Sequence, residues 1–217
     1  MRIVHWFRRD LRLADNTALT AAVRDSSGEV IPLFVLDDDL LKGKHVAPAR
    51  VAFMLDCLRE LDASLREAGS QLIVRRGNAE QEVLKLAQEA GAVAVYFNRD
   101  YTPAARTRDQ RVTSALQANS IRVESFRDLV VFEEDELLTG EGRPYTVFTP
   151  YKRAWLSQLG NVALGMGSVP EFKPLAIHNS TLSIPSSTDL GYSVTQRIPA
   201  GGERKAMALL MKFKDSG

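Results

Sequence analysis

The chain has a single cysteine, Cys57, among its 217 residues, which excludes an internal disulfide and any metal site built from several cysteines. It has no run of about 18 apolar residues, so the sequence predicts no membrane span. It also lacks an excess of charge of one sign, because 28 basic and 27 acidic residues leave a formal charge of +1. The whole chain therefore supplies no strong field for nucleic acid, and any contact with DNA must be local or lie elsewhere.

Several common functional motifs are absent as well. The sequence contains no G-x-G-x-x-G, no Walker loop and no H-E-x-x-H, so the dinucleotide, P-loop and zinc-protease classes lack their binding groups. His5, His45 and His178 are far apart in sequence, and we expect scattered histidines and no metal. The segment Met1–Leu13 becomes charged too early for a signal peptide. We therefore expect a cytoplasmic protein, and we expect it to be a monomer.

Short apolar runs that are rich in β-branched and aromatic residues predict strands. Each run is bounded by charged residues, Gly or Asn, as strands of globular domains often are. The overall composition, with 45% hydrophobic and 25% charged residues, is typical of soluble globular proteins. The expected strands are Ile3–Phe7, Val30–Leu36, Leu72–Val74, Val93–Phe97 and Ile121–Phe126.

Segments between these strands have helical spacing. The clearest helix is expected from Pro48 to Ala68, where an apolar stripe recurs every three or four residues. Asp15 or Asn16, Asn78 and Thr102 are expected to cap three further helices. Strands that alternate with helices predict an α/β fold, a doubly wound, five-stranded parallel sheet with helices on both faces. Ligands of such sheets bind beyond the carboxyl ends of the strands, here the loops Arg8–Asp15, Asp37–Ala47 and Asn98–Thr102.

The second half of the chain has weaker periodicity. We expect an α/β domain over 1–132, an aromatic segment and linker over 133–202, and the start of a truncated helical domain over 203–217. Ser, Pro and Gly are frequent between 160 and 202, which is typical of a linker that lies over a surface or is disordered. The final segment, Glu203 to Lys214, has Met207, Leu210 and Phe213 at helical spacing, and a short helix with such a face needs a partner surface.

Several motifs, in order, resemble those of the photolyase and cryptochrome family. The string W-F-R-R-D-L-R-L-A-D-N at Trp6–Asn16 is similar to the family's opening W-x-R-x-D-L-R-x-x-D-N. The later matches cover nearly the whole chain, except for Gly160 to Ala200, which contributes little. They are Leu33–Asp37, Ala47–Arg50, Tyr96–Asp100, Tyr145–Tyr151 with Trp155, and Gly201–Glu203.

The resemblance implies a light-driven enzyme of DNA repair. Members of this family are carbon–carbon lyases in which reduced FAD, held in a C-terminal helical domain, donates an electron to a pyrimidine dimer in UV-damaged DNA. A second, antenna chromophore in the N-terminal α/β domain absorbs light and passes the excitation to the flavin. This chain matches only the antenna-binding part, so we expect it to lack the FAD domain and to be catalytically incompetent by itself.

The antenna implied by the resemblance is a deazaflavin, a folate or another flavin. Arg50 and Asp100 match positions that contact the antenna in deazaflavin-type photolyases, which favours 8-hydroxy-5-deazaflavin. Folate-type members tend to carry Asn-Glu after the fourth strand, where this chain has Ala104 and Ala105, so methenyltetrahydrofolate is disfavoured, and FMN is a further alternative. An apolar slot with a few polar groups suits a flat ring. The candidate cofactor-binding residues are Phe34, Leu36, Val46, Arg50, Val51, Met54, Asn98 and Asp100.

Three alternatives stay open at this point. The apolar candidates can equally be ordinary core, and Arg50 can merely pair with Asp37 or Asp100. The chain can belong to a cryptochrome-type blue-light receptor, because the features that separate receptors from repair enzymes lie outside it. It can also be a stand-alone nucleotide-binding module, although we find no Gly-rich phosphate loop to support that hypothesis.

Overall fold

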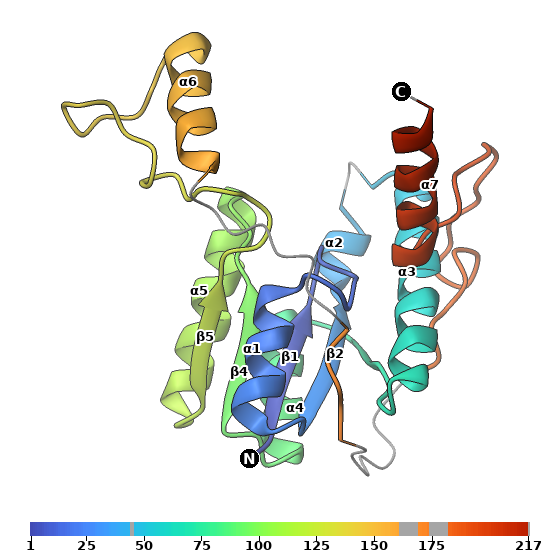
Figure 1. Ribbon diagram of the computed structural model, residues 1–217. Helices are drawn as coiled ribbons and strands as arrows, with labels where there is room; N and C mark the ends of the chain where they lie inside the picture. Colours follow the sequence, from blue (N-terminus) through green and yellow to red (C-terminus); the bar gives the residue numbers. More distant parts are fainter. Residues whose placement is uncertain (44–45, 161–168, 174–181, 217) are drawn as a thin grey trace.

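Five parallel strands form one sheet with the order β3-β2-β1-β4-β5 (Figure 1). The computed structural model describes residues 1–43, 46–160, 169–173 and 182–216. The fold class predicted from the sequence is confirmed, since each neighbouring pair of strands is parallel. The strands are β1 Ile3–Phe7, β2 Val30–Leu36, β3 Ile73–Arg76, β4 Ala94–Asn98 and β5 Arg122–Phe126.

Seven helices accompany the sheet within the part of the chain that the structure describes. The cap residues expected from the sequence are confirmed, because side chains of Asn16, Asn78 and Thr102 accept hydrogen bonds from backbone N–H groups of the first turns that follow them. None of the described helices is long and apolar enough to cross a membrane. The helices are α1 Thr17–Ser26, α2 Asp38–Leu41, α3 Pro48–Glu67, α4 Ala79–Glu89, α5 Pro103–Ala118, α6 Phe148–Leu159 and α7 Glu203–Asp215.

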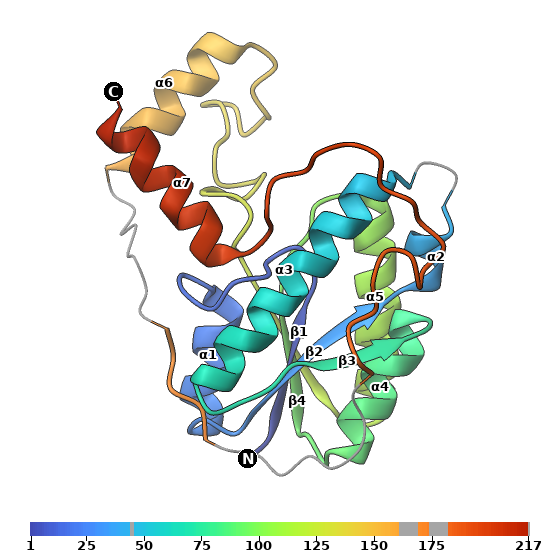
Figure 2. The ribbon, with the colours of Figure 1, turned by 90° about the vertical axis from the view of Figure 1, so that its right-hand side faces the viewer.

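Helices cover both faces of the sheet (Figure 2), and an apolar layer lies between the helices and each face. On one face α1 and α3 pack against β1, β2 and β4, and the expected stripe of α3 is buried as Val51, Leu55, Leu58, Leu61 and Leu65. On the other face α4 and α5 pack against alternate residues of the same strands. The three central strands are thus buried on both sides, as parallel strands usually are.

The strand at each edge differs slightly from its expected range. The strand expected at Leu72–Val74 is Ile73–Arg76, because Arg75 and Arg76 continue the pairing with β2 although their side chains are polar. The strand expected to begin at Ile121 begins at Arg122. Edge strands tolerate such polar residues, and hydrophobic runs alone therefore misplace their ends.

The described parts of the expected linker lie on the α/β domain. Phe172 is buried in the core layer beside α3, and the Lys173 backbone N–H donates to the Gly28 carbonyl at 2.9 Å. The Leu182 backbone N–H donates to the Val74 carbonyl at 3.0 Å, which places this segment along the outer edge of β3. These described parts therefore act as straps around the sheet, while the rest of 161–181 lies outside the described residues.

Helix α6 was not expected from the sequence. It covers Phe148–Leu159 within the aromatic segment and buries none of its residues. Its contact with the preceding segment includes an edge-to-face pair between Phe132 and Trp155, whose ring centroids are 5.8 Å apart. The expected final helix is present as α7, and it too has no buried residue, with Phe213 exposed at 79%.

Candidate functional site

The strand order reverses between β1 and β4, which is where ligands of open α/β sheets usually bind. The β1–α1 loop follows Phe7 and the β4–α5 loop follows Asn98, so both loops emerge at this point. They border an open hollow of ≈ 180 Å³. The hollow is lined by Arg8, Arg9, Asp10, Asn98, Arg99, Asp100 and Leu129.

A buried network of polar side chains forms the floor beneath this hollow. The Asn98 Nδ2 group donates to Asp10 Oδ2 at 2.6 Å and to Asn16 Oδ1 at 2.8 Å, and Asn98 Oδ1 accepts from the Ala18 backbone N–H at 3.0 Å. Asn16 Nδ2 returns bonds to the Asp10 carboxylate and to the Arg12 carbonyl. Asp10, Asn16 and Asn98 are each at most 4% exposed. Because leaving a buried polar group without a partner is costly, this network fixes the two loops relative to each other.

Arg8 ties the same two loops together from the other face of the sheet. Its guanidinium lies 4.9 Å from the Trp6 ring centroid and 4.7 Å from that of Phe97, which gives cation–π contacts on both aromatic groups. It donates to Asp109 Oδ1 at 2.5 Å and to the Asn98 carbonyl. Burial lowers the pKa of Arg8, and the Asp109 carboxylate opposes that shift. The charge is thus held in place by aromatic and anionic neighbours.

His5 lies in the middle of β1 and is completely buried beside this network. Its Nε2 atom is 3.9 Å from Asp10 Oδ2, and neither ring nitrogen has a hydrogen-bond partner among the described residues. Burial lowers the pKa of His5 to about 4, with Asp10 raising it and Arg8 lowering it further. The ring is neutral near pH 7, so its approach to Asp10 is not an ion pair at that pH.

Asp100 lines the mouth of the hollow and is held as an anion. Burial raises its pKa, but hydrogen bonding from Thr102, including its backbone N–H at 3.1 Å, and the charge of Arg9 at 3.7 Å lower it, and the net shift is downward. The Arg9 side chain is 63% exposed. Together with Arg99, which is 39% exposed and bonded to Glu133, it gives the mouth a mixed and accessible set of charges. Such a mouth can bind the polar edge of a ligand through both donors and acceptors.

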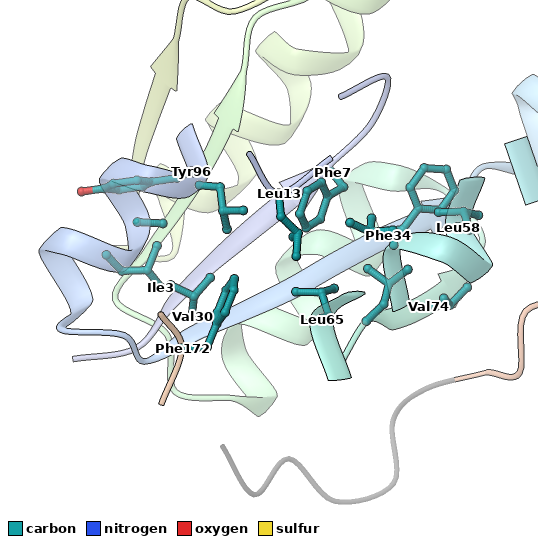
Figure 3. Packing of buried hydrophobic residues seen from close by; sticks show 14 of the residues in the cluster. Ile3, Phe7, Leu13, Val30, Phe34, Leu58, Leu65, Val74, Tyr96 and Phe172 are labelled. Carbon is teal, nitrogen blue, oxygen red and sulfur yellow. The ribbon is translucent and has the colours of Figure 1, made fainter. Parts of the chain in front are cut away.

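The structure places the apolar candidates at β2, which neighbours β1 in the sheet, and at α3 and the residues just before it. Phe34 (Figure 3), Leu36 and Val51 belong to the buried core layer between β2 and α3. Val46 and Met54 pack at the margin of this layer and are partly buried. Asn98 lies on the same face of the sheet, because it bonds to α1. Strand β1 separates β2 from β4, so the ends of those two strands are about 10 Å apart.

Arg50 is exposed in the first turn of α3, and it does not line the hollow. The alternative that it merely pairs with Asp37 or Asp100 is wrong. No ion pair joins Arg50 to either carboxylate among the described residues: the Asp37 carboxylate accepts from the Asp39 backbone N–H, and Asp100 interacts with Arg9 and Thr102. The structure thus brings Asn98 and Asp100 together at the hollow, whereas Arg50 is exposed and is not among the residues that line it.

Several residues at the hollow were missing from the candidate set. Arg8, Arg9 and Asp10 follow β1 directly, and the rule that ligands bind at the switch point could have identified them. Leu129 comes from the segment after β5, and no sequence motif indicates it. His45 and His178 lie outside the described residues. Among the described residues, no group of three or more His, Cys, Asp or Glu side chains is arranged to hold a metal ion.

Comparisons with known proteins agree on one family. Residues 3–171 match the family model described as DNA photolyase. The chain is 36% identical over 223 residues to the deoxyribodipyrimidine photo-lyase of Synechococcus sp., an alignment that covers 98% of this chain and 45% of that protein. The chain thus spans about half the length of the curated photolyases it matches.

Solved structures give the same result. A class III photolyase from Agrobacterium tumefaciens superposes with a TM-score of 0.82 at 28% identity, covering 99% of this chain and 44% of that one. An archaeal photolyase from Sulfolobus tokodaii, solved with two FAD molecules, has a TM-score of 0.79 at 27% identity and covers 97% of this chain and 46% of its own. From its motifs, its sheet and these relatives, the chain belongs to the DNA photolyase family.

Proposed function

We propose that this chain is the light-harvesting part of a photolyase, and that it binds an antenna chromophore at the carboxyl edge of its sheet. The observation that supports this most strongly is the hollow at the switch point between β1 and β4, whose floor is a buried and fully bonded polar network. No protein side chain absorbs near-visible light, so a protein of this family must supply a binding site for a pigment. A rigid site keeps the pigment in a fixed orientation, which energy transfer requires.

The size of the hollow limits how a chromophore can lie. The hollow is open, and its ≈ 180 Å³ of empty space includes solvent beyond its walls, so it cannot enclose a whole chromophore. It therefore accommodates one polar end of a ring system, next to Asp100. The rest of the ring would extend across the end of β1 toward Val46 and Met54, which present partly buried apolar groups at the margin of the core. Arg50, exposed at the start of α3, would meet the far end.

The pigment that suits these residues best is 8-hydroxy-5-deazaflavin. A flat ring with polar edges matches a carboxylate at one end, a guanidinium at the other and apolar side chains between them. At the place where folate-type relatives carry Asn-Glu, Ala105 is buried in the first turn of α5 and Ala104 has only a methyl group, so no side chain there can bond to a folate. FMN and FAD remain alternatives, because Arg9 and Arg99 could bind their phosphates.

The chemistry of DNA repair would take place in a part that this chain does not contain. We propose that residues 1–132 form the antenna domain, 133–202 connect it to the next part, and 203–217 begin a helical domain that binds FAD. In the complete protein, the bound pigment would supply excitation to reduced FAD, which would donate an electron to damaged DNA. The chain alone would bind the pigment without repairing DNA.

The test is an absorption and fluorescence titration of the purified chain with 8-hydroxy-5-deazaflavin. We expect saturable binding with a red-shifted band, and weaker binding of methenyltetrahydrofolate and FMN. An Asp100→Asn variant should bind about tenfold or more weakly, since it loses a charged partner of the ring. Asp135→Asn is the matched control, because Asp135 is exposed and is not among the residues that line the hollow.

A second pair of variants tests the far end of the site. Arg50→Ala should weaken binding of the pigment, whereas Arg111→Ala, which removes an exposed arginine from α5, should not. Absence of binding for every one of the three pigments would contradict the proposed function. Equal affinities of Asp100→Asn and the unmodified chain would show that the pigment binds elsewhere.

A further inference from the structure

A carboxylate at the start of α7 is bound by the loop that borders the hollow. Glu203 Oε2 accepts from the Leu13 backbone N–H at 2.8 Å, and Oε1 accepts from the Ala14 backbone N–H at 3.1 Å. Figure 2 shows the first turn of α7 beside the β1–α1 loop and α3. Contacts of this kind join residues 189 and 190 positions apart in the sequence, so they fix two distant segments to each other.

The loop has the backbone shape that suits an anion. Two successive N–H groups point at one carboxylate, and the next residue, Asp15, has a left-handed conformation with φ 52. Successive N–H groups in such a turn form a concave site for a negative group. Leu13 is 1% exposed and belongs to the core layer, so the loop cannot follow α7 away from the sheet without exposing that side chain. Glu203 therefore binds to a firmly anchored site.

The start of α7 is fixed on its other side by α3. A Cβ atom added to Gly201 would lie 2.8 Å from Cys57 Sγ and 2.9 Å from the Cys57 backbone nitrogen, which leaves room only for glycine. Glu60 Oε2 accepts from the Glu203 backbone N–H at 3.1 Å, so α3 holds the first backbone group of α7. The Glu203 side chain thus has a fixed origin, and its reach to the loop is set by the chain itself.

The loop bound by Glu203 also carries the residues of the hollow. Arg8, Arg9 and Asp10 line it, and Asn16 ends the loop within the buried network. We infer that Glu203 is a positioning residue, which holds the β1–α1 loop in its ligand-binding shape and links the occupancy of the hollow to the placement of α7. The first part concerns the loop alone, and the link to ligand occupancy rests on the proposed function.

Hydrogen exchange measures the first part without any pigment. In a Glu203→Gln variant, the side chain has one acceptor oxygen in place of two. Its NH₂ group would face one of the two backbone N–H donors and repel it, so both loop bonds weaken. We expect the amides of Leu13 and Ala14 to exchange about tenfold or more faster than in the unmodified chain. Glu203→Asp keeps the charge with a shorter reach and should give an intermediate rate.

Arg204→Ala is the matched control, because it removes ion pairs of the same helix turn with Glu60 and Glu67 but leaves the Glu203 carboxylate in place. It should leave the exchange of the loop amides unchanged. Circular dichroism of all variants shows whether they keep the fold. Unchanged exchange in Glu203→Gln, or equal acceleration in Arg204→Ala, would overturn the assignment of Glu203 as the residue that holds the loop.

The second measurement is the affinity for 8-hydroxy-5-deazaflavin. We expect Glu203→Gln to bind it several-fold more weakly and Arg204→Ala to bind it like the unmodified chain. Faster loop exchange with unchanged affinity would overturn the link between α7 and the hollow. If the unmodified chain binds no pigment at all, the proposed function fails, whereas the exchange result still decides whether Glu203 holds the loop.

Discussion

Replacing Asn98 with alanine removes the residue that joins the two loops beneath the hollow. The side chain makes three hydrogen bonds, to the Asp10 carboxylate, to Asn16 Oδ1 and from the Ala18 backbone N–H. A hydrogen bond to a carboxylate contributes about 1.5–3 kcal/mol and a neutral one about 1 kcal/mol. We therefore expect the free energy of unfolding to fall by about 4 kcal/mol, a large part of the 5–15 kcal/mol typical of a domain.

The loss is measurable by urea unfolding followed by far-UV circular dichroism at neutral pH. With a slope of about 2 kcal/mol per molar urea, the midpoint should fall by about 2 M. Asn119→Ala is the control, because Asn119 is exposed and bonds to Ala115 and Gln88 at the surface, and its cost should be within about 0.5 kcal/mol. A loss below about 1 kcal/mol for Asn98→Ala would refute the view that this network fixes the loops.

The remaining predictions concern other groups around the sheet. Burial lowers the pKa of His5 from 6.5 to about 4, so protonation opposes folding and stability falls with acidification. Between pH 7 and pH 4 the free energy of unfolding of the unmodified chain should fall by about 3 kcal/mol because of His5, and His5→Phe should not show this part of the loss. Urea midpoints at both pH values would show the difference. Burial and the bond to Asp25 raise the pKa of Tyr96 from 10.0 to about 12, so its stabilising effect is complete below pH 10 and is lost as the pH rises toward 12. Burial also raises the pKa of Tyr101, so the signal to follow in phenolate absorption is the late-ionising component that disappears in Tyr96→Phe. Arg8→Met removes two cation–π contacts while Asp109 keeps Arg108 as a partner, so we expect a loss of about 2 kcal/mol in urea unfolding; no loss would contradict a stabilising role for the buried cation.

The architecture of the α/β domain could be predicted from the sequence because its signals are local. Buried parallel strands are continuous apolar runs, and cap residues such as Asn16 and Thr102 precede the helices that they stabilise. Helix α6 could not be predicted in the same way. Proline breaks helices in their interior, but Pro150 lies in the first turn of α6, where a backbone N–H would have no intrahelical acceptor. The apolar side chains of α6 are exposed, so no pattern of buried residues indicated this helix.

The site was predictable only in part, because its position follows from topology and its details follow from tertiary packing. The strand-end rule identified the loops that contain Asn98 and Asp100, and both line the hollow. No sequence rule predicts that Arg8 is buried between Trp6 and Phe97, since arginine is usually exposed. The hydrogen bonds of Glu203 to Leu13 and Ala14 join opposite ends of the chain, and only the folded structure brings these ends together.

We propose that a flat pigment lies across the carboxyl ends of β4, β1 and β2, with Asp100 at one end. A crystal structure of the chain with 8-hydroxy-5-deazaflavin tests it most directly. We predict the ring over the hollow, with a polar edge within hydrogen-bond distance of the Asp100 carboxylate and its apolar face near Met54. A pigment bound at any other surface, with the hollow empty, would contradict the account.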